Sequence, residues 1–180
     1  MSPIKLTWEN LNDNSVENMA VIYRDDHILA ESTVIYQKDS KITYKVNLDC
    51  EWTTKSVYIE VDHKPILRLF TDRNGKWFNH LNQELDNLDG ARDIDLSISP
   101  FTNSLPINRL PWKLNQKREL EMVYISLPIL QVKKVKQIYT FLKDEKNRRV
   151  FKYQSGEFAA DITVDESGYI VDYPNLFLRR

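Results

Sequence analysis

The sequence has little of what most catalytic and nucleotide-binding motifs require. It contains one cysteine, Cys50, so no disulfide can form within the chain. Four glycines occur in 180 residues, and they form no P-loop, dinucleotide fingerprint or G-x-S-x-G elbow. Because phosphate cradles depend on the backbone N–H groups of glycine-rich loops, we expect no nucleotide and no other cofactor.

Charge of one sign and long apolar runs are also missing. Lys and Arg number 25 and Asp and Glu number 26, for a formal net charge of -1. A nucleic-acid-binding domain usually carries a basic surface, so no nucleic-acid partner is expected. No run approaches the roughly 18 apolar residues of a spanning helix, and residues 1–9 lack the apolar core of a secretory signal. We therefore expect no transmembrane segment and a cytoplasmic location.

The usual metal ligands are few and scattered. His27, His63 and His80 lie in or near predicted turns, without the i, i+4 spacing of a helical zinc site. Cys50 ends an alternating apolar segment, where a cysteine is usually a small buried residue rather than a nucleophile. The sequence predicts no metal site.

What the chain does contain is a series of short alternating segments separated by polar turns. Hydrophobic residues make up 42% and charged residues 28%, as in globular proteins. With no linker and no repeat, residues 1–180 are predicted to form one domain. Strands are predicted at 16–24, 28–37, 42–50, 56–61, 66–71, 93–99, 119–127, 132–142, 149–153 and 158–164.

The connections complete this pattern. Asn74-Gly75 predicts a hairpin, residues 81–90 a loop rather than a helix, and residues 100–111 about one helical turn. The lysines of residues 133–136 indicate a solvated strand edge, and the apolar tail 169–177 is expected to dock back onto the domain. About a dozen strands curl rather than stay flat. We predict an all-β fold, a single curved antiparallel sheet forming an unclosed barrel, with one or two short helical turns.

Two carboxylates stand out in the strand at 93–99. Asp93 and Asp95 are two residues apart, so their side chains leave the strand on one face, roughly 7 Å from each other. They could bind a metal or sugar hydroxyls, or act as an acid–base pair. Alternation alone favours a simpler interpretation, in which they form the solvated outer face of a half-buried strand or cap nearby backbone amides.

The residues after these carboxylates are not explained by alternation. Thr102 and Asn103 can close a turn and cap a short helix. Arg109 could pair bidentately with Asp93 or Asp95 as a buried structural lock, or bind the polar head of a ligand. The lock is favoured, and the two roles are compatible if the lock lines a cavity. Aromatic residues, 11% of the chain, could fill the core or line a lipid-sized cavity.

Residues 93–110, DIDLSISPFTNSLPINRL, resemble the central signature of the bacterial family described as Putative glycolipid-binding. Residues 50–54, 127–128 with 137–140, and 164–168 with 172–177 fit the same family. The resemblance implies an unclosed barrel similar to lipoprotein carriers, with a glycolipid ligand. Carried over by position, it points to the ligand-binding residues Asp93, Asp95, Thr102, Asn103, Arg109, Gln137 and Tyr139. It implies no catalytic residue.

The first functional hypothesis is therefore non-enzymatic binding of a glycolipid or other amphipathic molecule in the concavity of the sheet. The carriers that the family resembles work in the cell envelope, whereas an export signal is not expected in this sequence. One alternative is an enzyme that acts on a sugar- or lipid-like substrate through Asp93 and Asp95. Another is a protein-interaction module that uses sheet edges or a dimer face. The oligomeric state stays open.

Overall fold

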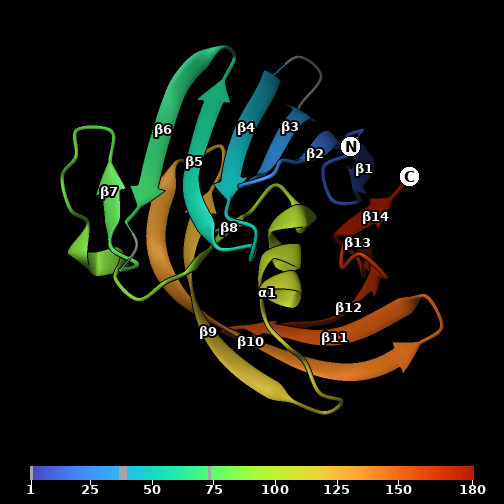
Figure 1. Cartoon of the computed structure of the whole chain (residues 1–180). Helices are drawn as coiled ribbons and strands as arrows, with labels where there is room; N and C mark the ends of the chain where they lie inside the picture. Colours follow the sequence, from blue (N-terminus) through green and yellow to red (C-terminus); the bar gives the residue numbers. More distant parts are fainter. Residues whose placement is uncertain (1, 37–39, 73) are drawn as a thin grey trace.

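The computed structural model describes residues 2–36, 40–72 and 74–180, and most of them lie in one sheet (Figure 1). Its strands are β1 (Ile4–Asn10), β2 (Val16–Tyr23), β3 (Ile28–Tyr36), β4 (Ser40–Leu48), β5 (Thr54–Val61), β6 (Lys64–Thr71), β7 (Trp77–Asn79), β8 (Asp93–Leu96), β9 (Lys117–Ser126), β10 (Gln131–Glu145), β11 (Arg148–Ser155), β12 (Phe158–Asp165), β13 (Ile170–Tyr173) and β14 (Phe177–Arg179). The predicted all-β class is confirmed. Gln37, the last residue of one predicted strand, lies outside the described residues.

The sheet curls without closing. Its strand order is β7-β6-β5-β4-β3-β2-β1-β14-β13-β12-β11-β10-β9-β8, and the end strands β7 and β8 do not pair with each other. The C-terminal β14 pairs with β1, with Trp8 opposite Arg179, so the tail docks as expected. Neighbouring strands are antiparallel except β8, which runs parallel to β9. The predicted unclosed barrel is confirmed, with this one parallel pair within the described residues.

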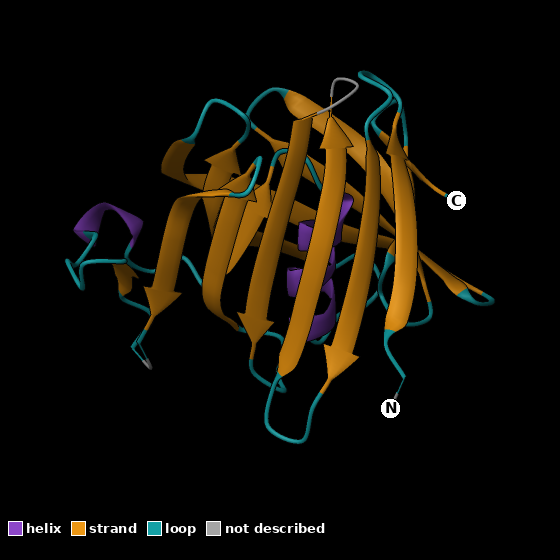
Figure 2. Cartoon of the chain, turned by 90° about the horizontal axis from the view of Figure 1, so that it is seen from above, coloured by secondary structure: helices purple, strands orange, loops and turns teal. Residues whose placement is uncertain are grey.

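A short helical segment lies inside the curve of the sheet (Figures 1 and 2). It starts with a 3-10 turn, Pro100–Asn103, and continues as α1, Ser104–Arg109. Ser99 caps the turn by accepting a hydrogen bond from Phe101 N at 3.1 Å, and proline at the first position suits a helix start. A second 3-10 turn covers Asp86–Leu88. No helix in the described part of the chain is long and apolar enough to cross a membrane.

The apolar core forms two clusters. The first cluster packs mainly aliphatic side chains of β1–β6 and β9, such as Val46 and Ile59, with Leu105 of α1. The second cluster packs mainly aromatic side chains of β10–β14, such as Phe151 and Tyr173, with Ile107 of α1. The helix therefore sits between the two halves of the curled sheet and contributes one residue to each.

β8 lies between the same two halves, which corrects the prediction for its carboxylates. Ile94 and Leu96 belong to the first cluster, and the side chains of Asp93 and Asp95 leave the opposite face of the strand. That face is covered as well, since Asp93 is 0% and Asp95 9% exposed. The expected solvated outer face is wrong, because the curl of the sheet encloses its own edge strand.

Three local expectations also changed. Cys50 is exposed rather than buried, because β4 ends at Leu48 and the cysteine falls in the following turn. The strand predicted at 93–99 ends at Leu96, where Ser99 N turns back to donate to Leu96 O at 3.1 Å. The lysine-rich tract lies in an interior strand. Even so, β11 pairs with β10 only from Ile138 onward, so residues 131–137 are paired with β9 alone.

Candidate functional site

All seven residues indicated by the sequence meet on the second-cluster side of β8. Arg109 Nε donates to Asp93 Oδ1 at 3.0 Å, and a terminal nitrogen of Arg109 donates to Asp93 Oδ2 at 2.5 Å. The Asp93 side chain is 1% and the Arg109 side chain 14% exposed. This is a buried two-bond pair that ties the end of α1 to β8. The lock considered from the sequence exists, with Asp93 as the partner.

The other five residues form one hydrogen-bond network. Asp95 accepts from Thr102 Oγ1 at 3.0 Å and from Gln137 Nε2 at 2.5 Å. Tyr139 donates from its hydroxyl to Asn103 Oδ1 at 2.9 Å and lies 3.3 Å from Gln137 Oε1. The network joins β8 and the helical turn to β10 across the interior of the barrel.

Asp95 is a buried carboxyl with neutral partners. Burial is the largest influence on its ionisation and raises the pKa of Asp95. Hydrogen bonds from Gln137, Thr102 and Tyr153 act in the opposite direction. Its hydrogen-bond partners within the described residues include no lysine or arginine. Asp95 therefore differs from Asp93, whose charge is balanced by a guanidinium.

A cavity of about 450 Å³ opens beside this network. It lies beside the part of β10 that precedes Ile138 and does not pair with β11. Its wall therefore includes Val135 from β10 and Ser155 from the end of β11. Asp95 and Asn103 also lie on the wall, whereas the other five candidate residues are outside the lining. The sequence thus indicated the right neighbourhood, but two of its seven residues can touch a ligand directly in this cavity.

The side wall of the cavity is aromatic, and the sequence did not single out these rings. Phe158, Tyr153 and Tyr173 form a mutually contacting group with ring centroids 5.9 to 6.2 Å apart. Phe177 contacts Tyr173 at 6.0 Å. The four rings come from β11 to β14, strands whose contribution to one wall depends on the curl of the sheet. Alternation marks them as inward-facing, but it does not show which inward residues border an empty volume.

Sequence reasoning also missed Glu17 in β2, a buried carboxyl whose hydrogen-bond partners, like those of Asp95, are neutral side chains. It is 2% exposed and accepts hydrogen bonds from Ser32 Oγ at 2.7 Å, Ser99 Oγ at 2.9 Å and the Tyr44 hydroxyl. Burial raises the pKa of Glu17 to about 7, and the three hydroxyl donors oppose the rise. A signal was present, because Glu17 falls in the inward phase of β2 with Met19.

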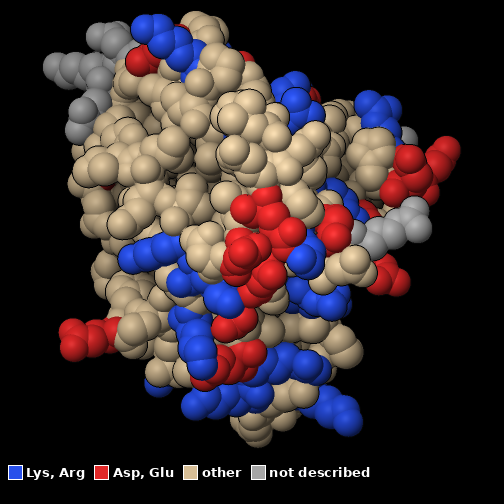
Figure 3. Space-filling model, turned by 90° about the vertical axis from the view of Figure 1, so that its left-hand side faces the viewer, with Lys and Arg blue, Asp and Glu red and all other residues tan. Residues whose placement is uncertain are grey.

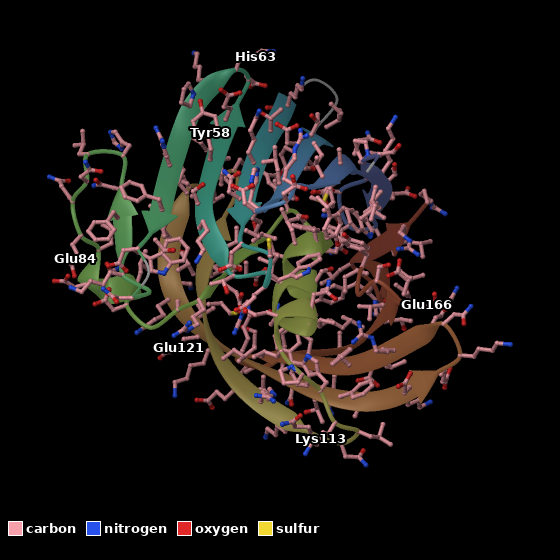
Figure 4. All side chains as sticks on the ribbon, in the orientation of Figure 1. Tyr58, His63, Glu84, Lys113, Glu121 and Glu166 are labelled. Carbon is pink, nitrogen blue, oxygen red and sulfur yellow. The ribbon has the colours of Figure 1, made fainter. Side chains whose placement is uncertain are left out.

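Two other features of the surface are less suited to a site. A larger hollow, about 570 Å³, lies against β1–β5 and is lined by outward-facing polar side chains such as Lys45. Its lining also includes His63 of the β5–β6 turn, which is labelled in Figure 4. It contains none of the seven residues. The carboxylates of Glu84, Asp86 and Asp89 lie within 4.8 Å of one another. Glu84 is labelled at the left in Figure 4, and Figure 3 shows that side of the molecule, where acidic and basic side chains are mixed. Lys76 already pairs with Glu84 there.

Comparison with known proteins agrees with the fold. The family model described as Putative glycolipid-binding matches residues 5–179. The structure is similar to the crystal structure of a DUF1089 family protein from Pseudomonas aeruginosa, with 29% sequence identity and a TM-score of 0.74. The similarity covers 92% of each chain. No curated protein matches this sequence.

Proposed function

The chain belongs to the Putative glycolipid-binding family, and we propose that it binds a glycolipid-like amphipathic molecule, without transforming it, in the cavity beside Asp95. One observation carries the proposal. The cavity combines a buried carboxyl that has room for further hydrogen bonds with a wall of aromatic rings. Its volume of about 450 Å³ lies within the range of small-molecule sites.

The two parts of the wall suit the two parts of such a ligand. An ionised carboxyl offers about four acceptor positions, and the hydrogen bonds from Thr102, Gln137 and Tyr153 to Asp95 use about three of them. Hydroxyl groups of a sugar could occupy the rest. The rings of Tyr153, Phe158 and Tyr173 present flat apolar surface, which favours the faces of a sugar ring or an alkyl chain.

The same geometry favours binding over catalysis through Asp93 and Asp95. Acid–base chemistry on a glycosidic bond uses two carboxyl groups that both face the substrate. Here Asp93 is engaged by Arg109 and is outside the cavity lining, so Asp95 would have to act alone. A single carboxyl with hydrogen-bond partners and an aromatic wall is the arrangement of a recognition site.

The proposal is tested by native mass spectrometry of freshly purified protein, followed by titration with a neutral alkyl glucoside. Ser155→Trp should fill the cavity and lower the affinity by about tenfold or more. Gln154→Trp is the matched control, since the neighbouring side chain of a strand points to the opposite face. Protein that carries no lipid and binds no glucoside, or equal binding by both variants, would contradict the proposal.

A further inference from the structure

The wall of the cavity changes in character from its interior to its opening. Asp95, Ser99 and Asn103 are buried, at 9%, 2% and 5% exposed, and they supply polar atoms to the interior. Phe158 is 43% exposed and Leu176 is half-buried, and both lie on the wall near solvent. The buried part of the wall therefore holds these polar atoms together with the rings of Tyr153, Tyr173 and Phe177, and the part near solvent holds Phe158 and Leu176 beside Lys133.

Exposed apolar side chains continue from the opening onto the surface. Leu11 is 44% exposed and donates from its backbone N–H to the carbonyl of Leu176 at 2.8 Å. Elsewhere on the cavity wall, the hydroxyl of Ser97 accepts a hydrogen bond from the backbone N–H of Leu127 at 2.9 Å. The turn that follows Leu127 carries Ile129, 83% exposed. Apolar groups thus flank the opening from two separate turns.

Resting on the proposed function, we infer that the ligand binds head first. A neutral head rich in hydroxyl groups would lie at Asp95 and Asn103, and its alkyl chain would run along Phe158 toward Ile129 and solvent. This order places the hydroxyl groups beside the buried polar atoms and the chain beside Phe158 and Leu176 near solvent. The opposite order would place methylene groups against a buried carboxyl and leave its remaining acceptor positions without donors.

The charges also determine the class of head. A phosphate or carboxylate beside Asp95 would place two like charges in a buried site without a compensating cation, which is unfavourable. The lysine on the wall is Lys133, an exposed residue whose ammonium lies 5.7 Å from the centre of the Tyr124 ring. An anionic head would therefore be drawn to the opening, with its chain pointing inward. Head-first binding selects a neutral polyhydroxylated head.

Photo-crosslinking distinguishes the two orientations. The probe is an alkyl glucoside with a diazirine at the end of its chain, bound to the full-length protein and mapped by peptide mass spectrometry. Head-first binding predicts labelling of the turn at Ile129 or of Phe158. Labelling of the peptide that contains Asp95 and Asn103 would overturn the orientation and leave the proposed function intact. Absence of saturable binding would overturn both.

Affinities of two variants give an independent readout. Wild-type protein should bind dodecyl glucoside about tenfold or more tightly than dodecyl phosphate. Asp95→Asn, which removes the charge with little change in shape, should reduce that preference by about tenfold. Lys133→Ala should lower the affinity for dodecyl phosphate more than the affinity for dodecyl glucoside, because the anionic head would lie beside Lys133. Equal losses for the two ligands with Lys133→Ala, together with an unchanged preference in Asp95→Asn, would show that the head of the glucoside lies at the opening. Lys133 is exposed, so its replacement tests the inference even if Asp95→Asn fails to fold.

Discussion

The two halves of the curled sheet each bury a carboxyl that has no cationic partner, but one of these two carboxyls borders the cavity and the other does not. Glu17, beside the first cluster, shares three hydroxyl donors and does not line the cavity. Asp95, beside the second cluster, has donors on both oxygens and also borders the cavity. Burial raises the pKa of both groups. The difference is access, which makes one carboxyl part of the core and the other available to a ligand.

The side chains around the two carboxyls explain this difference. Among the described residues, aromatic side chains make up six of the ten buried residues of the second cluster and six of the 27 in the first. Tyr153, Tyr173 and Phe177 of the second cluster line the cavity, whereas Leu96 is the one buried residue of the first cluster, among those described, that does so. We infer that the aromatic half keeps the cavity open, while the aliphatic half packs around Glu17.

The largest expected effect is at the boundary between the halves. Arg109→Ala should lower the free energy of unfolding by roughly 3–5 kcal/mol, because it leaves Asp93 as a buried carboxylate without its partner. Urea unfolding of the variant measures this loss. Arg92→Ala removes an exposed arginine near the same aspartate and is the control. Equal stability of the two variants would mean that the Asp93–Arg109 pair does not hold the halves together.

A somewhat smaller effect should appear as pH dependence from Glu17. Burial raises the pKa of Glu17 to about 7 in the folded chain, from an ordinary value of 4.5. Between these values the folded state keeps a proton that the unfolded state has released, so stability falls as pH rises from about 4.5 to 7 and then levels off. The shift corresponds to about 3 kcal/mol. Glu17→Gln should remove this fall.

The measurement is urea unfolding at pH 5 and pH 8, for wild type and Glu17→Gln. The control is Glu119→Gln, at an exposed carboxyl paired with Lys136. If Glu17→Gln lost as much stability between the two pH values as wild type, the buried carboxyl would not be the source of the dependence.

The smallest effect compares one tyrosine from each half. The Tyr44 hydroxyl donates to Glu17 and lies 2.8 Å from Ser99 Oγ, so Tyr44→Phe removes a donor from a sealed carboxyl and should cost roughly 1–3 kcal/mol. Tyr173 lines the cavity, and the hydrogen bonds to Asp95 come from Thr102, Gln137 and Tyr153 rather than from Tyr173. Tyr173→Phe should therefore cost less than about 0.5 kcal/mol. Thermal unfolding of both variants tests whether the halves differ, and similar losses would contradict the comparison.

The strand pattern was readable because most strands bury one face. Ile42, Tyr44, Val46 and Leu48 of β4 all point inward, as alternation predicted. The same rule failed at β8. An alternation of polar and apolar residues normally indicates that one face of the strand is exposed to solvent. In β8 the curl of the sheet covers both faces. Alternation describes a strand and its immediate surroundings, whereas enclosure of an edge strand depends on the whole sheet.

The candidate site was predictable only in part for a similar reason. The resemblance led to Asp95 and Asn103, and to five neighbouring residues. Three of these five, Thr102, Gln137 and Tyr139, hydrogen-bond Asp95 or Asn103, and the other two form the Asp93–Arg109 pair. The resemblance did not lead to Phe158 or Tyr173, because their proximity to Asp95 arises from strands that are far apart in sequence and meet only when the sheet curls. Which inward residues leave a gap between them is a property of packing, and no local pattern encodes it.

The edges of the unclosed sheet have a consequence for aggregation. An open sheet normally offers unpaired backbone groups that can recruit a strand from another chain. Here β8 is buried, and β7 is covered on its outer side, where Leu85 N donates to Trp77 O at 2.8 Å. The open part of β6 carries Lys64, Pro65 and Arg68, residue types that discourage strand addition. The sheet can thus stay unclosed without becoming a template for cross-chain β-structure.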